Sequence, residues 1–240
     1  MGLDASVLES IREYLFYLIE SDVEEVHIPQ ATVEEALAGG MRGNGEIVPE
    51  EQGLRAIREG LGECTRCPLS KTRQTIVFGE GDPFSEVVFV GEAPGADEDR
   101  TGRPFVGRAG QLLNQIIEKG MGLSRSDVYI GNILKCRPPS NRTPREEEVE
   151  VCLPFLKKQI AVIEPKVIVT LGRPAAQALL KTQEPMHRLR GNWQDYQGIP
   201  LMPTYHPAYV LRYYTVPIRR QVWQDVQEVM RFLEELADGS

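Results

Sequence analysis

The pattern that most restricts the fold is an alternation of short apolar runs with helix-like segments. Four runs have the length and composition of buried strands, at residues 87–91, 128–134, 167–172 and 200–204. Helical spacing of apolar residues marks the segments 108–121, 145–163, 174–181 and 217–237. Strands that alternate with helices form parallel βαβ units. The sequence therefore predicts a three-layer α/β/α fold around a central, mainly parallel four-stranded sheet.

Three segments of unusual chemistry leave or end these predicted strands. They are GEAPGADEDRTGRPFVGRAG (91–110), IGNILKCRPP (130–139) and MPTYHPAYVLR (202–212). In open parallel sheets ligands bind beyond the carboxyl ends of the strands, so we expect the three segments to form one cleft. The glycine patterns of dinucleotide-binding and P-loop proteins are absent from the sequence.

Residues 1–53 differ in character from residues 54–240, which we take as the main domain. Residues 3–19 predict an amphipathic helix, because their apolar positions are Leu3, Val7, Leu8, Ile11, Leu15, Leu18 and Ile19. The stretch 21–53 is acidic and without periodicity, which is typical of a flexible linker. We expect the helix to dock on the main domain or on a protein partner; a disordered leader is the alternative.

The net charge of −8 is concentrated in the N-terminal segment. Residues 1–60 hold 13 of the 35 acidic and 4 of the 27 basic residues, so the remainder is nearly neutral and compatible with a polyanionic partner. No apolar run approaches the roughly 20 residues that cross a bilayer. The start MGLDASVLES has neither the basic nor the apolar region of a secretory signal. We expect a cytoplasmic protein without membrane association.

The chain has four cysteines, and their chemistry has several interpretations. Cys64 and Cys67 form a CxxC pair, and Cys136 and Cys152 follow it. Disulfides do not fit a reduced cytoplasm, whereas buried free thiols are compatible with the sequence. Four thiolates also suit a structural zinc ion or a [4Fe–4S] cluster. The spacing alone does not decide between iron–sulfur, zinc and free thiols.

The segment 91–110 combines backbone freedom with charge. Gly91 and Gly95 allow a ligand close to the backbone, and Pro94 stiffens the turn. Its carboxylates are Glu92, Asp97, Glu98 and Asp99. A solvated turn would explain any single acid here. The position between a core strand and Phe105 favours a binding loop.

Two further polar residues stand out at strand ends. Asn132 interrupts an apolar strand, and a buried amide needs partners for both its donor and its acceptor; capping of a nearby loop is the alternative role. His206 precedes Pro207 and an apolar–basic run that includes Val210, Leu211 and Arg212. An apolar wedge beside a cation suits entry into a stack of bases. Basic residues that could follow a phosphate backbone are Lys135, Arg137, Arg142, Arg145, Arg188, Arg190, Arg219 and Arg220.

Together these segments resemble family 4 uracil-DNA glycosylases. The resemblance rests on GEAPGADEDRTGRPFVG, IGNILKCRPPSNRTP, HPAYVLR and the order of the cysteines, and it runs from about residue 54 to 236. It implies an enzyme that flips uracil out of DNA and hydrolyses its N-glycosidic bond, which initiates base excision repair. It also implies a [4Fe–4S] cluster on Cys64, Cys67, Cys136 and Cys152.

The resemblance implies roles for individual residues as well. Phe105 would stack on the flipped uracil, Asn132 would hydrogen-bond its Watson–Crick edge, and His206 would bind the O2 side where charge develops. Gly91 and Ala93 belong to the base-binding loop with Glu92 and Glu98. Glu98 would stand near C5 and help to exclude thymine. Val210 or Leu211 would fill the gap in the DNA, and Arg212 would hold phosphate.

Two departures limit what the resemblance carries over. The best-known uracil glycosylases have a water-activating Asp where this chain has Ala93, so Glu92 becomes the candidate activator. Lys135 lies beside a cluster cysteine and is interpreted as a phosphate contact rather than a Schiff-base former, which predicts a monofunctional enzyme. We expect a monomer acting on uracil-containing DNA. The alternative is a non-catalytic iron–sulfur module that recognises uracil or DNA ends.

Overall fold

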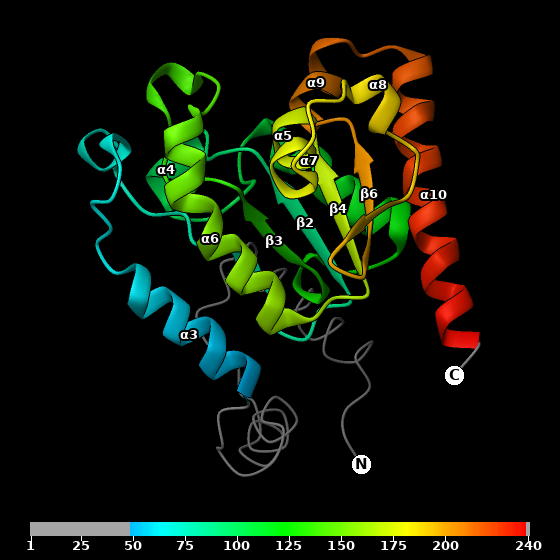
Figure 1. Cartoon of the computed structure of the whole chain (residues 1–240). Helices are drawn as coiled ribbons and strands as arrows, with labels where there is room; N and C mark the ends of the chain where they lie inside the picture. Colours follow the sequence, from blue (N-terminus) through cyan, green and yellow to red (C-terminus); the bar gives the residue numbers. More distant parts are fainter. Residues whose placement is uncertain (1–48, 239–240) are drawn as a thin grey trace, which may run out of the picture. The chain divides into compact units, whose positions relative to one another are not determined.

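The computed structural model describes residues 49–238, within the compact unit Pro49–Ser240 (Figure 1). The predicted helix at 3–19 and most of the predicted linker lie outside the described residues. The prediction that the linker extends to residue 53 was wrong, because helix α3 (Pro49–Leu61) already occupies residues 49–53. This helix packs on the main domain: a Cβ at Gly53 would lie 2.7 Å from Val162 Cγ1.

The sheet has six strands in the order β1-β3-β2-β4-β6-β5. All four predicted strands are present and pair in parallel, as β2 (Val87–Gly91), β3 (Tyr129–Asn132), β4 (Val167–Leu171) and β6 (Ile199–Thr204). The antiparallel edge strands β1 (Glu80–Gly81) and β5 (Gln194–Tyr196) were not predicted. Each edge strand is too short, or too polar, to give an apolar run.

Alternate residues of the sheet face two helical layers, which confirms the predicted α/β/α fold. Val87 and Phe89 pack in one core with α5 (Arg108–Gln115), the π-helical turn η2 (Ile116–Met121) and α10 (Val216–Asp238). Val88 and Val90 pack in the other with α6 (Glu146–Ile163) and α7 (Arg173–Leu180). Figure 1 shows α6 crossing in front of the sheet and α10 on the right, next to β6.

The remaining elements are short and lie in the connections. They are η1 (Pro68–Lys71), α4 (Ala96–Thr101), η3 (Arg125–Asp127), η4 (Pro139–Asn141), α8 (Met186–Leu189) and α9 (Pro207–Arg212). Gly91 pairs with Asn132 and Leu171 with Thr204, so the carboxyl ends of the central strands lie side by side. Within residues 49–238 no helix is both long and apolar enough to cross a bilayer.

Candidate functional site

A cavity of about 540 Å³ opens at the carboxyl ends of the strands. It is formed by residues that follow β2, β3 and β6, as the sequence predicted. Of the predicted site residues, those in its wall are Glu92, Ala93, Glu98, Phe105, His206 and Arg212. Pro138, Asn141, Arg142 and Thr143 also contribute, and the sequence analysis had not assigned them a site role beyond the positive charge of Arg142.

Gly91 and Asn132 are not among the residues that line this cavity, but both lie beside Phe105, which does line it. A Cβ at Gly91 would lie 2.3 Å from Asn132 Oδ1 and 2.5 Å from Phe105 Cζ, so only glycine fits between them. Asn132 is 2% exposed, and its Oδ1 has no hydrogen-bond partner among the described residues. A buried acceptor without a donor is costly. The amide is therefore suited to a ligand that brings an N–H group.

Phe105 is held in an unusual backbone conformation. Its φ is +51°, which is uncommon for a residue with a side chain. Arg125 donates to the carbonyl oxygens of Pro104 (2.6 Å) and Phe105 (3.3 Å). A Cβ at Gly110 would lie 1.8 Å from the Phe105 oxygen, so α5 approaches the loop as closely as its backbone permits. Several contacts thus fix the position of the aromatic ring.

Glu98 braces the same loop with both carboxylate oxygens. Oε2 accepts a hydrogen bond from Gly95 N (3.1 Å), and Oε1 accepts from Val106 N and Gly107 N (2.9 Å each). The side chain thereby joins the start of α4 to the turn that follows Phe105. Its predicted place in the wall of the site agrees with the cavity lining. The structure adds a second role, because this carboxylate positions the loop.

His206 caps helix α9 and faces Phe105. Its Nδ1 accepts a hydrogen bond from Ala208 N (3.0 Å), which places the proton of the neutral ring on Nε2. The ring centroids of His206 and Phe105 are 5.7 Å apart. Burial lowers the pKa of His206 to about 4, although the charge of Glu98 opposes this effect. At neutral pH the imidazole is an uncharged Nε2–H donor.

Glu92 lies at the junction of two cavities. The second, of about 610 Å³, shares Glu92, Thr143, His206 and Arg212 with the first. Burial raises the pKa of Glu92, and the positive charge of Arg173 partly offsets this. Arg173 was missed in the sequence. It follows Gly172 at the end of β4, and the strand-end argument applied to the other loops would have found it.

The structure corrects the predicted DNA wedge. Val210 is 3% exposed and belongs to the hydrophobic core beside α5 and α10, so it cannot enter DNA. The short helix α9 turns this residue inward. Leu211 is half-buried, and Arg212 is exposed and lines both cavities. Of the two apolar candidates, only Leu211 keeps an accessible surface.

Two of the predicted phosphate contacts are also wrong. Lys135 is 1% exposed, and its Nζ donates to Gln159 Oε1 at 2.7 Å. Burial lowers its pKa to about 8, while the nearby Cys152 opposes the shift. Arg190 forms an ion pair with the buried Asp225, and its side chain is 16% exposed. Both cations serve internal contacts rather than the surface.

The four cysteines line one small cavity between η1, the end of β3 and helix α6. Three of the four sulfur atoms accept hydrogen bonds: Arg66 Nη1 lies 3.2 Å from Cys64 Sγ, Arg73 Nη1 lies 3.6 Å from Cys136 Sγ, and Lys135 N lies 3.2 Å from Cys152 Sγ. Burial raises the pKa of Cys136 to about 12. Among the described residues, no group of three or more Cys, His, Asp or Glu side chains is arranged to hold a single metal ion.

Comparison with known proteins agrees with the geometry of the site. The profile described as "Uracil DNA glycosylase superfamily" matches residues 78–227. A type-4 uracil-DNA glycosylase of Thermotoga maritima is 43% identical over 187 residues, which are 77% of this chain and 97% of that protein. The enzyme of the same name from Saccharolobus solfataricus is 44% identical over 75% of this chain and 86% of its own. The chain belongs to the type-4 family of the uracil DNA glycosylase superfamily.

Proposed function

We propose that the protein is a monofunctional uracil-DNA glycosylase, which hydrolyses the N-glycosidic bond of a flipped uracil and leaves an abasic site. The observation that carries this proposal is the buried Asn132 amide, whose Oδ1 lacks a donor, beside Phe105 and a neutral His206. The relatives named uracil-DNA glycosylase support the substrate. A base must leave the stack to reach such a site.

The uracil ring presents a carbonyl beside an imide N–H, and Asn132 can pair with both. Its Oδ1 accepts the imide N–H, and its amide nitrogen donates to the neighbouring carbonyl. Cytosine presents the opposite arrangement at this edge. The fixed Phe105 ring provides a stacking surface in the same wall. Recognition therefore combines hydrogen bonds with stacking.

His206 stabilises the leaving uracil. Negative charge grows on the base as the glycosidic bond breaks, and a preorganised N–H donor stabilises that charge. A neutral imidazole suits this task, because its Nδ1 is bound by Ala208 N and its Nε2–H remains to donate. Glu92, whose pKa is raised by burial, is the candidate to orient or activate the attacking water.

Among the described residues, no lysine lies in the wall of either cavity, which is compatible with hydrolysis without a Schiff base. Lys135 is the lysine that the sequence placed nearest these loops, and it is buried against Gln159. We expect the product strand to keep its backbone intact.

Cys64, Cys67, Cys136 and Cys152 would hold the [4Fe–4S] cluster. Four thiols around one cavity, with N–H groups and cations directed at sulfur, form a donor set suited to a cluster with anionic ligands. When bound, the cluster supplies a structural cross-link between η1, the end of β3 and α6.

The proposal is tested by release of uracil from a labelled single strand that contains one uracil. The cluster-loaded wild type is compared with Asn132→Ala, and with Asn192→Ala as a matched change at an exposed asparagine. We expect release by the wild type and by the control, and at least a hundredfold slower release by Asn132→Ala. Binding without release by the wild type would instead support a non-catalytic uracil-binding module.

A further inference from the structure

The surface beyond His206 differs in charge from the rest of this acidic chain. No Asp or Glu occurs between Asp195 and Asp225, whereas Arg212, Arg219 and Arg220 all lie in that interval. The interval includes α9 and the first turns of α10, and all three arginines are exposed. A polyanion would meet no repelling carboxylate from this segment.

Tyrosines form a ladder along the same segment. The ring centroids of Tyr205 and Tyr209 are 4.9 Å apart with an interplanar angle of 25°, and those of Tyr209 and Tyr213 are 4.8 Å apart at 48°. Tyr209 lies in α9 and Tyr213 caps its C-terminal end, so their spacing of four residues places both rings on one side of this helix, while Tyr205 precedes the helix. Tyr209 and Tyr213 are 41% and 48% exposed. Large aromatic surfaces left this open are typical of binding sites.

The ladder begins in the site already described. Tyr205 and Tyr209 line the second cavity together with Glu92, His206 and Arg212. Tyr213 continues the stack outward from that cavity. Beyond it, Tyr214 is 60% exposed and lies under the guanidinium of Arg219, at 4.5 Å from its ring centroid. The aromatic surface is thus continuous with the proposed uracil site.

We propose that this tyrosine ladder binds unpaired bases of the DNA strand beside the uracil, an inference that rests on the proposed function. A base stacks on the outer side of Tyr213, and Arg212 and Arg219 contact the neighbouring phosphates. Stacked aromatic rings with interspersed cations bind single strands in this way. Paired bases in a duplex have both faces covered, so the ladder favours single-stranded over duplex DNA around the lesion.

The test uses the full-length, cluster-loaded protein and a single strand with one 2′-fluoro-2′-deoxyuridine, in which the fluorine slows cleavage. Dissociation constants are compared for Tyr213→Ala, Tyr213→Phe and the wild type. We expect about tenfold weaker binding by Tyr213→Ala and wild-type binding by Tyr213→Phe, because phenylalanine keeps the ring. Wild-type binding by Tyr213→Ala would overturn the proposal. Melting temperatures show that each variant is folded.

A second measurement locates the contact. In strands with 5-iodocytosine at successive positions from the uracil, irradiation should cross-link a flanking base to the peptide that contains Tyr213. Cross-links confined to other peptides would overturn the proposal. Arg219→Gln should lower the slope of log Kd against log salt by about one unit, as expected for one lost phosphate contact. An unchanged slope would show that Arg219 does not contact a phosphate.

Uracil release from a single deoxyuridine nucleotide with methyl-capped 5′ and 3′ phosphates separates this inference from the proposed function. Such a substrate has no flanking base to stack on the ladder, so wild type and Tyr213→Ala should release uracil equally. A selective loss by Tyr213→Ala on this substrate would contradict the ladder as a surface for flanking bases. If the wild type released no uracil from any substrate, the proposed glycosylase function would be rejected. The binding and cross-linking results would still show whether the tyrosine ladder binds DNA bases.

Discussion

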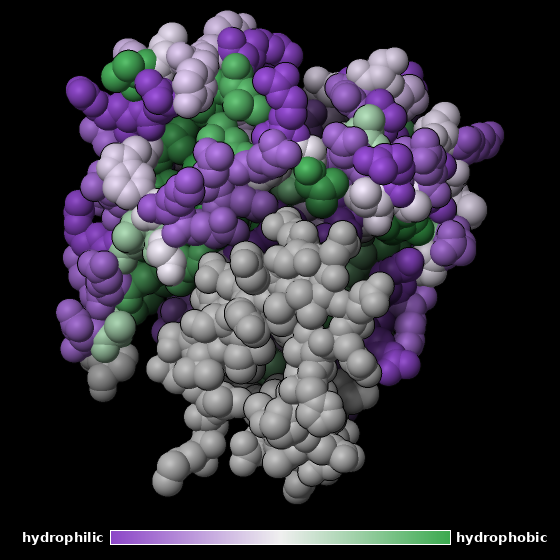
Figure 2. Space-filling model, turned by 180° about the vertical axis from the view of Figure 1, so that it is seen from behind, coloured by the Kyte–Doolittle hydropathy of each residue, from purple (hydrophilic) through white to green (hydrophobic). Residues whose placement is uncertain are grey.

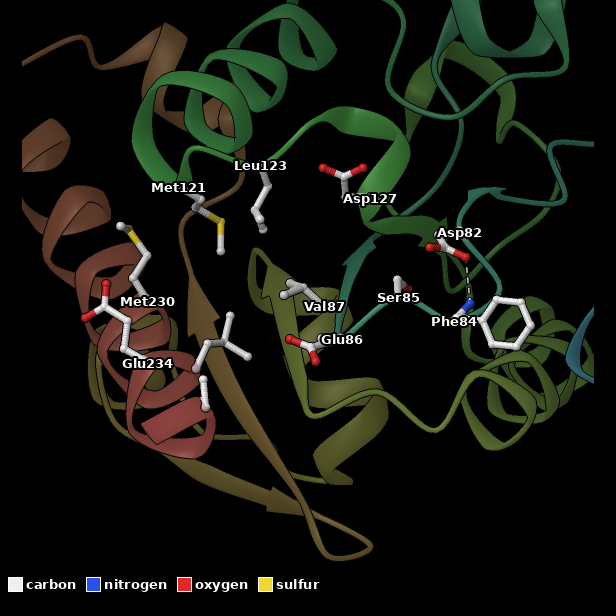
Figure 3. Close-up of a pocket in the computed structure, with 12 residues that line it drawn as sticks. Asp82, Phe84, Ser85, Glu86, Val87, Met121, Leu123, Asp127, Met230 and Glu234 are labelled. Atoms are coloured by element: carbon white, nitrogen blue, oxygen red, sulfur yellow. Dashed lines mark hydrogen bonds between the residues drawn. The ribbon is translucent and has the colours of Figure 1, made fainter. Parts of the chain in front are cut away.

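The two ends of the sheet carry cavities of similar size but different chemistry. The cavity at the carboxyl ends has a volume of about 540 Å³, and the one at the amino ends about 510 Å³. In Figure 3 the side chains of Val87, Met121, Leu123 and Met230 surround one space, with carboxylates of Glu86, Asp127 and Glu234 around them. At the carboxyl ends an amide, a neutral imidazole and a fixed aromatic ring meet instead.

Volume therefore does not identify the functional site of this fold. Figure 2 shows hydrophobic residues in separate patches between hydrophilic ones on the coloured part of the reverse face, so apolar surface is not confined to one place either. The polar residues of the proposed site lie in the loops that follow the parallel strands, so they meet at the carboxyl ends of the sheet. Carboxylates line both cavities, but Arg142 and Arg212 accompany Glu92 and Glu98 at the carboxyl ends, whereas no basic residue lines the amino-end cavity among the described residues. The uncompensated carboxylates at the amino ends would repel phosphate. Single substitutions at each end can show whether the two ends differ in function as they do in chemistry.

The largest effect is expected at His206. His206→Ala removes the N–H donor that stabilises the leaving base, so kcat for uracil release should fall about 100- to 1000-fold. Leu233→Ala in the amino-end cavity should leave kcat within about twofold, although it trims an apolar side chain and lowers the melting temperature. Single-turnover release from a uracil strand measures both. If His206→Ala and Leu233→Ala lost the same amount of kcat, the two ends of the sheet would not differ in function.

The pH dependence of stability should report the neutral state of the half-buried His206. Its pKa is about 4 in the folded protein and about 6.5 in the unfolded chain. Between these values the unfolded state binds the proton and the folded state does not, so stability is lost as the pH falls from 6.5 towards 4. The loss amounts to about 3 kcal/mol.

This contribution is isolated by subtraction. The free energy of unfolding in urea is measured for the wild type and His206→Gln at several pH values, since glutamine does not titrate. As the pH falls from 6.5 to 4, the wild type should lose about 3 kcal/mol of stability relative to His206→Gln. Met230→Ala at the amino end should show a difference from wild type that does not vary with pH. A constant difference for His206→Gln would contradict a lowered pKa for His206.

A smaller effect is expected from the support of Phe105. Arg125→Ala removes the hydrogen bonds to the carbonyls of Pro104 and Phe105, so the ring loses its fixed position and kcat/KM should fall about tenfold. Arg103→Ala is the matched control, because Arg103 also pairs with Glu80 and is itself exposed. If both variants lost the same activity, the shared partner Glu80 rather than the loop carbonyls would be responsible.

These contacts mark the limit of what the sequence could predict. The four parallel strands came from apolar runs, and their order along the chain already placed the polar loops at one edge of the sheet. The supporting role of Arg125 was not predicted, because its partners Glu80 and Phe105 are distant in sequence and approach it only in the fold. Val210 was misassigned for a related reason. An apolar residue beside a cation suggests a wedge, but the orientation of α9 decides which side chain faces the core.

The smallest effect is expected from the charge of the amino-end cavity. Glu234→Lys changes the charge at that end by two units, yet the cavities lie at opposite ends of the five-residue strand β2, about 16 Å long. The Debye length at physiological ionic strength is about 8 Å, so binding of a uracil strand should change less than twofold. The dissociation constant at 0.15 M salt measures this. A large gain in affinity would mean that DNA reaches the amino ends, and the two cavities would then belong to one continuous binding surface.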